Sequence, residues 1–328
     1  MADLRAGLIG LGMMGRHHAR VLGSLPGVEL VAVADPGGDV HGAAAGRPVH
    51  EDIHQLIAAG IDYCMVAVPT AYHEEVGLAL AEAGVHAIIE KPLAPDTPSA
   101  EKLANAFATR GLVGAVGHIE RYNPALQQAR ARLEAGDLGE VHQVATRRQG
   151  PFPARIADVG VVKDLGTHDI DLTAWVTQQS FVTVAARTAY KSGREHEDLV
   201  AVVGQLSNGT VTNHLVNWLS PLKERVTIIT GERGTLVADT LTADLTYYAN
   251  GEVATTWDDI ANFRGVSEGD VVRYAIPKPE PLRVEHEQFR NAVLGEDADI
   301  VTLEQGLATV RVAEACIQSA ATGQTITV

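Results

Sequence analysis

The sequence predicts an α/β fold in two domains, on three observations. Its 328 residues exceed what one hydrophobic core usually organises. Up to about residue 112, short apolar runs alternate with longer stretches of helical periodicity, which is typical of a doubly wound parallel sheet. After Gly117 long β-branched runs dominate. We therefore expect a first domain over residues 1–119 and a second over 120–328, the latter an α/β domain with a large, mostly antiparallel open sheet.

The elements of the first domain follow from the hydrophobic period. Apolar runs too short for helices predict buried strands at residues 4–9, 30–34, 63–68, 86–89 and 112–116. Apolar residues at helical intervals predict helices at residues 16–25, 53–59, 73–83 and 98–109.

The second domain is expected to begin with helices at residues 124–135 and 167–175. Strands are predicted at residues 141–149, 181–190, 199–206, 210–219, 225–230 and 235–248. Turn signals such as Ser207-Asn208-Gly209 and Asn250-Gly251 suit hairpins between them. Residues 258–281 are interpreted as irregular, and 283–294 and 303–322 as closing helices.

Composition excludes several classes of function. A net charge of −15 argues against a nucleic-acid-binding surface. No apolar run approaches the roughly 18 residues of a membrane span, and no signal peptide is evident, so we expect a cytoplasmic protein. The two cysteines, Cys64 and Cys316, lie far apart without a Cys/His cluster. Neither a disulfide framework nor a metal site is expected.

A glycine-rich loop, Gly10-Leu11-Gly12-Met13-Met14-Gly15, follows the first strand and opens a helix. Gly10 permits a tight turn, Gly12 lets the backbone approach a pyrophosphate, and Gly15 allows close packing of helix on strand. Asp35 ends the next strand, 20 residues after Gly15, at the spacing of a carboxylate that binds an adenosine ribose. This combination predicts a Rossmann domain. Because Asp35 repels a 2′-phosphate, NAD is favoured over NADP.

Glu90-Lys91-Pro92 closes the fourth strand, at the sheet edge where ligands collect in doubly wound folds. There Lys91 can meet both nicotinamide and substrate, and a positive nicotinamide ring would lower its pKa. A surface lysine is the alternative. Pro69, Thr70 and His73 follow the third strand, and they are either cofactor contacts or the start of a helix.

Asp164 and His168 are four residues apart, hence on one face if their segment is helical. An aspartate that holds or polarises a histidine is a familiar device for a general base. The alternative is that both side chains lie on the solvent-exposed surface and have no catalytic role.

As a set, Ile9-Gly10-Leu11-Gly12, Glu90-Lys91-Pro92 and Asp164-x-x-x-His168-Asp169 resemble the signatures of the Gfo/Idh/MocA oxidoreductases. The resemblance covers almost the whole chain. It implies a Rossmann domain followed by an α/β domain with a large open sheet, commonly in dimers or tetramers. It also implies hydride exchange between NAD(P) and a sugar or cyclitol carbinol, with Lys91, Asp164 and His168 at the catalytic positions.

Two further stretches, 117–124 and 150–162, are most similar to UDP-N-acetylglucosamine 3-dehydrogenase-like members of that family. They contain the substrate candidates Arg121, Tyr122 and Arg155. His118 stands where many relatives have asparagine, and it is the remaining candidate on the cofactor side.

A local excess of positive charge agrees with a charged substrate. Residues 121–163 contain seven basic and four acidic side chains in a chain of −15. Such a basic island can receive a diphosphate or a carboxylate. The alternative places Arg130 and Arg132 on a solvated helix face, and Arg147 and Arg148 on opposite faces of a strand.

The sequence therefore predicts an NAD-dependent dehydrogenase that oxidises a ring hydroxyl, at C3, of a nucleotide-activated sugar. His168 would take the proton, Asp164 would orient His168, and Lys91 would hydrogen-bond the reacting oxygen. The alternatives are an inositol or free-sugar dehydrogenase and a non-catalytic NAD-binding regulatory subunit. Beyond its small-molecule substrate, we expect neither nucleic acid nor membrane partners, and a homodimer or homotetramer.

Overall fold

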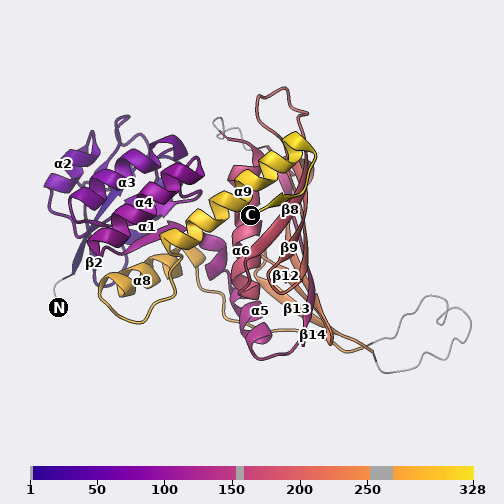
Figure 1. Ribbon diagram of the computed structural model, residues 1–328. Helices are drawn as coiled ribbons and strands as arrows, with labels where there is room; N and C mark the ends of the chain where they lie inside the picture. The colour runs from indigo at the N-terminus through magenta and orange to yellow at the C-terminus, as the bar shows by residue number, and fades with distance from the viewer. Residues whose placement is uncertain (1–2, 153–158, 252–268) are drawn as a thin grey trace, which may run out of the picture. The chain divides into compact units, whose positions relative to one another are not determined.

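The computed structural model describes residues 3–152, 159–251 and 269–328 (Figure 1). The chain divides into two compact units: unit 1 is formed by residues 1–119 and 280–314, and unit 2 by residues 120–279 and 315–328. The first division, between residues 119 and 120, has the predicted position, whereas residues 280–314, which were expected in the second domain, pack in the first unit. Helical periodicity shows that a segment is amphipathic but does not show which core it covers.

Unit 1 is built on a six-stranded parallel sheet of order β3-β2-β1-β4-β5-β6. Its strands are β1 (Leu4–Ile9), β2 (Val28–Ala34), β3 (Val49–His50), β4 (Tyr63–Val66), β5 (His86–Glu90) and β6 (Gly114–Gly117). Its helical segments are α1 (Gly15–Leu22), α2 (Ile53–Ala58), η1 (Thr70–Tyr72), α3 (His73–Glu82), α4 (Thr97–Arg110), α8 (Pro281–Val293) and the first part of α9 (Leu303–Thr322).

Apolar cores lie on both faces of this sheet, as a doubly wound fold requires. On one face Val66 and Ile89 pack with residues of α2, α3 and α4, joined by Val301 and Val310 from the returning segment. On the other face Leu8 packs with residues of α1 and with Phe289 of α8.

Unit 2 contains a nine-stranded sheet of order β14-β13-β12-β11-β7-β10-β9-β8-β15. Its strands are β7 (Val141–Pro151), β8 (Phe181–Ala189), β9 (Leu199–Leu206), β10 (Val211–Asn217), β11 (Leu219–Gly231), β12 (Gly234–Asp239), β13 (Asp244–Ala249), β14 (Val271–Arg273) and β15 (Ile326–Thr327). Its described helical segments are η2 (Ile119–Tyr122), α5 (Pro124–Glu134), η3 (Val162–Gly166), α6 (Thr167–Thr177) and the last part of α9. Only β7 and β10 pair in parallel among these described strands.

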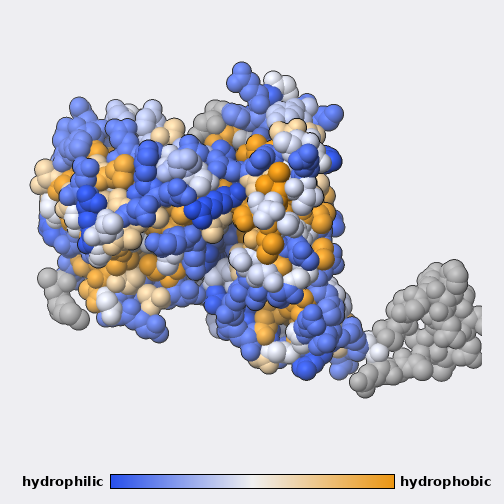
Figure 2. Space-filling model, viewed as in Figure 1, coloured by the Kyte–Doolittle hydropathy of each residue, from blue (hydrophilic) through white to orange (hydrophobic). Residues whose placement is uncertain are grey.

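Helices α5 and α6 cover one face of this sheet. Leu126 and Leu172 pack there with strand residues such as Val144 and Ile229. The opposite face is open: residues along β9 alternate between buried and exposed, and Val203 is 56% exposed. Figure 2 shows apolar side chains reaching the surface of unit 2 among polar ones. The predicted fold class, a Rossmann domain plus an α/β domain with a mostly antiparallel open sheet, is confirmed.

Several element predictions differ from the structure. The short strands β3 and β15 were not predicted, since two residues carry no readable period. The run 235–248 forms two strands, β12 and β13, because Asp239 accepts hydrogen bonds from the N–H groups of Leu241 and Thr242 and starts a turn. In addition, β14 lies within the stretch that was expected to be irregular.

Candidate active site

The glycine loop between β1 and α1 has the geometry of an anion cradle. Gly10 has φ +91°, and a Cβ there would lie 2.5 Å from the carbonyl oxygen of Ala67. A Cβ on Gly15 would overlap the carbonyl oxygen of Gly10. Gly12 has no atom within 4 Å of its Cβ position, so the space a side chain would fill is open. Met14, the N-cap of α1, makes no side-chain cap hydrogen bond. The loop therefore fits a pyrophosphate at the start of α1.

Asp35 follows directly after β2 and lies against this loop. Its Oδ2 accepts a hydrogen bond from the N–H of Leu11 at 2.7 Å, and its Oδ1 accepts one from the N–H of Gly37 at 2.7 Å. A carboxylate oxygen can accept more than one hydrogen bond, so both oxygens can still receive hydroxyl donors. The position and chemistry of Asp35 fit the ribose of a dinucleotide.

Lys91 begins the segment that leaves β5, and Pro92 follows it through a cis peptide bond. Its backbone N–H donates to Glu90 Oε2 at 3.1 Å. The other carboxylate oxygen, Oε1, lies 2.9 Å from His18 Nε2. Burial raises the pKa of Glu90, but the hydrogen bond from His18 and the charge of Lys91 more than offset this and hold it below its usual value.

His73, a predicted cofactor contact, is 1% exposed at the start of α3. Its Nδ1 lies 2.9 Å from the carbonyl oxygen of Pro92, and its Nε2 lies 3.0 Å from that of Val68. The ring thus joins the segment after β4 to the segment after β5, and burial lowers its pKa. This location favours a structural role for His73 over a contact with the cofactor. Pro69 and Thr70 lie at the start of η1, as the helix-start alternative described.

In unit 2, Asp164 lies on η3, a π-helical turn, and His168 lies in the first turn of α6. Both are largely buried, at 5% and 9% exposure. Single π turns occur frequently at functional sites. The carboxylate of Glu197 holds this turn, since its Oε1 accepts the N–H of Val162 at 3.0 Å. The sequence did not single out Glu197, because one acid in the polar stretch before β9 carries no local signal.

Most of the basic island is paired within unit 2. Arg121 donates two hydrogen bonds to Asp171, at 2.8 and 2.6 Å, and both side chains are buried. Arg148 is bonded to Glu120 and Asp169, each at 2.9 Å. Burial acts against the charge of Arg148, but the two carboxylates raise its pKa. Three more arginines pair with acidic neighbours: Arg130 with Glu134, Arg132 with Asp137 and Arg147 with Glu224.

These ion pairs change the interpretation of the island. Arg147 is exposed and Arg148 buried, as the alternating-face alternative described. Tyr122 is 4% exposed and His118 is 1% exposed. The location of Arg121 favours an anchoring role over direct contact with substrate. Arg155 lies outside the described residues.

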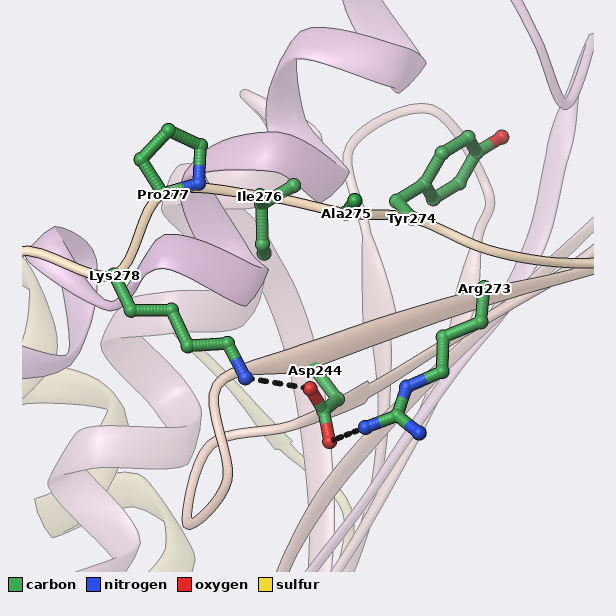
Figure 3. A pocket seen from close by; sticks show the side chains of 7 residues that line it. All are labelled: Asp244, Arg273, Tyr274, Ala275, Ile276, Pro277 and Lys278. Carbon is green, nitrogen blue, oxygen red and sulfur yellow. Dashed lines mark hydrogen bonds and ion pairs between the residues drawn. The ribbon is translucent and has the colours of Figure 1, made fainter.

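Figure 3 shows a surface pocket of unit 2 that involves none of the predicted site residues. It is lined by Asp244 and residues 273–278. Asp244 accepts hydrogen bonds from Arg273 and Lys278, each at 2.6 Å. The side chains of Arg273 and Lys278 are exposed, and that of Asp244 is half-buried.

Comparison with known families agrees with both units. Residues 4–118 match the NAD-binding Rossmann fold of the Gfo/Idh/MocA oxidoreductase family, and residues 130–328 match that family's C-terminal alpha/beta domain. The chain belongs to the Gfo/Idh/MocA oxidoreductase family. It therefore carries the family's NAD-binding domain, and the cofactor prediction is confirmed at this level. No helix in the described ranges is long and apolar enough to cross a membrane.

Among curated proteins, the chain is 33% identical to UDP-N-acetylglucosamine 3-dehydrogenase of Acidithiobacillus ferrooxidans over 216 residues, 65% of this chain and 66% of that one. It is 28% identical to inositol 2-dehydrogenase 2 of Saccharopolyspora erythraea, over 98% of this chain and 94% of that one.

Two solved structures resemble the fold throughout. The A. ferrooxidans UDP-N-acetylglucosamine 3-dehydrogenase superposes with a TM-score of 0.85 at 27% identity, covering 99% of this chain and all of that one. GenD2 from gentamicin A biosynthesis, solved with NAD, superposes with a TM-score of 0.82 at 26% identity, covering all of this chain and 97% of that one.

Proposed function

We propose that this chain is an NAD-dependent dehydrogenase that reversibly oxidises a ring hydroxyl, at C3, of a nucleotide-activated sugar. The observation that carries the proposal is the combination of an open glycine loop backed by Asp35, Lys91 at the end of β5, and Asp164 and His168 on adjoining helical turns. A binding protein without catalysis has no need for an acid–base set of this kind.

Each residue has a distinct role in the proposal. His168 takes the hydroxyl proton, Asp164 orients the imidazole, and the Lys91 ammonium hydrogen-bonds the reacting oxygen. A secondary alcohol ionises far above neutral pH, so its proton must leave in step with the hydride, and an imidazole suits that task near neutrality. Bound NAD supplies the hydride acceptor.

The nucleotide part of the proposal is supported by the 33% identity with UDP-N-acetylglucosamine 3-dehydrogenase. The paired arginines add little support, because a guanidinium already bonded to a carboxylate attracts a phosphate weakly. Arg225 of β11 differs from the buried Arg121 and Arg148, because its side chain is 33% exposed and lies 3.3 Å from Glu120. Arg155 and Arg225 are therefore the side chains to test for a phosphate contact.

A second candidate is oxidation of a free cyclitol or sugar. It is supported by the match to inositol 2-dehydrogenase 2, which extends over nearly all of both chains. The two candidates share Lys91, Asp164 and His168 and differ only in what the substrate carries beyond its ring. A chain that binds nucleotide sugars needs a cationic contact for the diphosphate. A chain that binds inositol does not need one.

The deciding experiment is a thermal-shift and turnover screen with NAD present throughout. Nucleotide sugars, free hexoses and inositols are compared, and UDP alone serves as the control for the diphosphate. A ligand at 100 times its Kd stabilises the fold by roughly 2.7 kcal/mol. Turnover of inositol without a response to any nucleotide sugar would replace the first candidate by the second. NADH formation from neither class would contradict both.

We also infer that the chain forms a homo-oligomer through the open face of the unit 2 sheet. On that face Val203, Val211 and Leu215 from two adjacent strands are 56%, 46% and 37% exposed. Contiguous apolar surface of this kind commonly marks an interaction site. A second copy of the same face is a self-complementary partner for it.

A further inference from the structure

A cluster of two histidines and two glutamates is buried in unit 1 next to Lys91. His18 is on α1, Glu90 ends β5, and Glu285 and His286 are consecutive on α8. Both histidines are 0% exposed, Glu285 is 1% exposed, and the Glu90 side chain is 12% exposed. Burying such groups costs free energy unless they are hydrogen-bonded, so the direction of each bond is informative.

Hydrogen bonds link Glu90, His18 and His286, and the carboxylate sets the direction of the first of them. An ionised carboxylate only accepts, so His18 Nε2 carries the proton in its 2.9 Å contact with Glu90 Oε1. His18 Nδ1 lies 2.8 Å from His286 Nε2. Burial, and then His18, lower the pKa of His286. His286 thus holds the second nitrogen of the His18 ring while the first contacts Glu90.

We propose that Glu90 is a positioning residue for Lys91 and that His18 holds Glu90 in place. The proposal rests on the proposed function, in which Lys91 contacts the reacting oxygen. Glu90 Oε2 accepts the backbone N–H of Lys91 at 3.1 Å, and a Cβ on Gly117 of β6 would lie 3.4 Å from the same oxygen. The carboxylate is thereby held between β6 and the start of the Lys91 segment.

His18 also connects this strand end to the nucleotide loop. It lies on α1, one turn after Gly15, so the helix that begins at the glycine loop supplies the donor that fixes Glu90. A displacement of α1 is therefore passed to Lys91 through two hydrogen bonds, from His18 to Glu90 and from the Lys91 N–H to Glu90. Since misplacing a catalytic group by about 1 Å can cost roughly 100-fold in rate, this connection is expected to matter for turnover.

The ionised form of Glu90 depends on His18. The titratable groups around Glu90 are His18 from α1, Lys91 next in the chain, His73 from α3, and Glu285 and His286 from α8. Burial raises the pKa of Glu90, and the hydrogen bond from His18 opposes this effect. Without that donor the carboxyl takes up a proton at higher pH.

A matched pair of variants tests the proposal. His18→Gln keeps an N–H donor near the Nε2 position, whereas His18→Asn places its donor near Nδ1 and leaves Glu90 without one. His18→Asn should lower kcat by about 10- to 100-fold and move the acidic limb of the kcat–pH profile to higher pH. It should also speed hydrogen–deuterium exchange of the Lys91 amide, which reports on Glu90 without any turnover. His18→Gln should restore much of kcat, of the position of the acidic limb and of the slow exchange of the Lys91 amide. His54→Asn, on the exposed face of α2, is the neutral control.

The outcomes separate this proposal from the proposed function. If Lys91→Ala turns over normally, the role of Lys91 is wrong, whatever His18 does. If Lys91→Ala is inactive but both His18 variants share the wild-type pH profile and amide exchange, the positioning role is overturned. If His18→Asn lowers the melting temperature but leaves the acidic limb of the kcat–pH profile unchanged, the contact between His18 and Glu90 is purely structural. This result also overturns the positioning role. Should His18→Asn fail to fold, Glu90→Gln is measured instead, with faster exchange of the Lys91 amide as the expected result.

Discussion

Asp35 and Leu11 are joined by a 2.7 Å hydrogen bond, in which the backbone N–H of the glycine loop donates to the carboxylate at the end of β2. The bond fixes the carboxylate beside the loop that fits a pyrophosphate. A negative charge held in that position attracts ribose hydroxyls and repels a 2′-phosphate.

We therefore expect NAD to bind more tightly than NADP. Asp35→Asn keeps an oxygen that can accept from Leu11 but removes the charge, and it should narrow the preference by about tenfold, or 1.4 kcal/mol. Asp35→Ala should narrow it further and loosen the loop. Calorimetric titration with both nucleotides measures the ratio, and equal affinity in the unmodified protein would show that Asp35 does not face the ribose.

Gly12 and Gly15 should respond differently to the same added methyl group. The Cβ of Gly12→Ala enters open space, so the variant should keep its melting temperature but lose at least roughly tenfold in NAD affinity, because the methyl occupies the cradle. The Cβ of Gly15→Ala meets the backbone of Gly10, so this variant should lose about 1–3 kcal/mol of stability. Thermal unfolding and calorimetry of both variants test this, and undiminished NAD binding by Gly12→Ala would contradict it.

His168→Ala should lower kcat and kcat/KM together by roughly 10² to 10⁴-fold, with NAD affinity nearly constant, because a general base acts in the transition state. Asp164→Asn should cost less if it only orients the ring. Lys91→Ala should also lower kcat and can weaken NAD binding as well. Single-turnover NADH formation across pH distinguishes the roles. Near-normal turnover of His168→Ala, with loss of turnover and of the acidic limb in Lys91→Ala, would make Lys91 the base.

The element pattern of both units could be predicted because it depends on local periodicity. The strand Leu4–Ile9 has the predicted bounds, since six apolar-rich residues lie directly before a glycine turn. Asp35 and Lys91, which lie at the ends of predicted strands, could be predicted for the same reason. The partners of those residues could not be predicted: Glu197, Asp171 and His18 act through contacts with segments distant in sequence. His17 and His18 are followed by alanine and arginine, a pattern typical of a polar helix face, so the buried position of His18 could not be predicted.

Glu285 should make stability depend on pH. Burial, and then the charge of Glu90, raise its pKa well above 4.5. A carboxyl with a raised folded-state pKa contributes stability that is present below its unfolded-state value and is lost as pH rises through the folded-state value. Glu285→Gln cannot ionise, so its stability relative to wild type should increase from pH 5 to pH 8, by at most about 1.4 kcal/mol per pH unit. Urea unfolding at several pH values measures this difference.

Glu296→Gln, at an exposed position beyond α8, is the matched control for that series and should show no trend with pH. A difference between Glu285→Gln and wild type that stays constant across the range would mean that Glu285 does not hold its proton in the folded state.

Self-association is expected to depend on the open sheet face. Val203→Lys and Leu215→Lys introduce charges among the exposed apolar residues of β9 and β10, and they should lower the mass measured by light scattering towards the 34.7 kDa of one chain. Val40→Lys is the control, because Val40 is 77% exposed in unit 1. If the unmodified protein has the mass of one chain at micromolar concentration, the proposed interface is contradicted.

The return of residues 280–314 to unit 1 affects how the protein is made on the ribosome. Val301 accepts the backbone N–H of Val116 at the edge strand β6, and Phe289 contacts Tyr63 in the core. Domains usually fold in the order in which they are synthesised. Here the nucleotide-binding unit cannot be completed until more than 150 residues of the other unit have been synthesised. The apolar surface that α8 covers is therefore exposed during much of translation. Nascent chains are therefore expected to depend on chaperones until α8 leaves the exit tunnel.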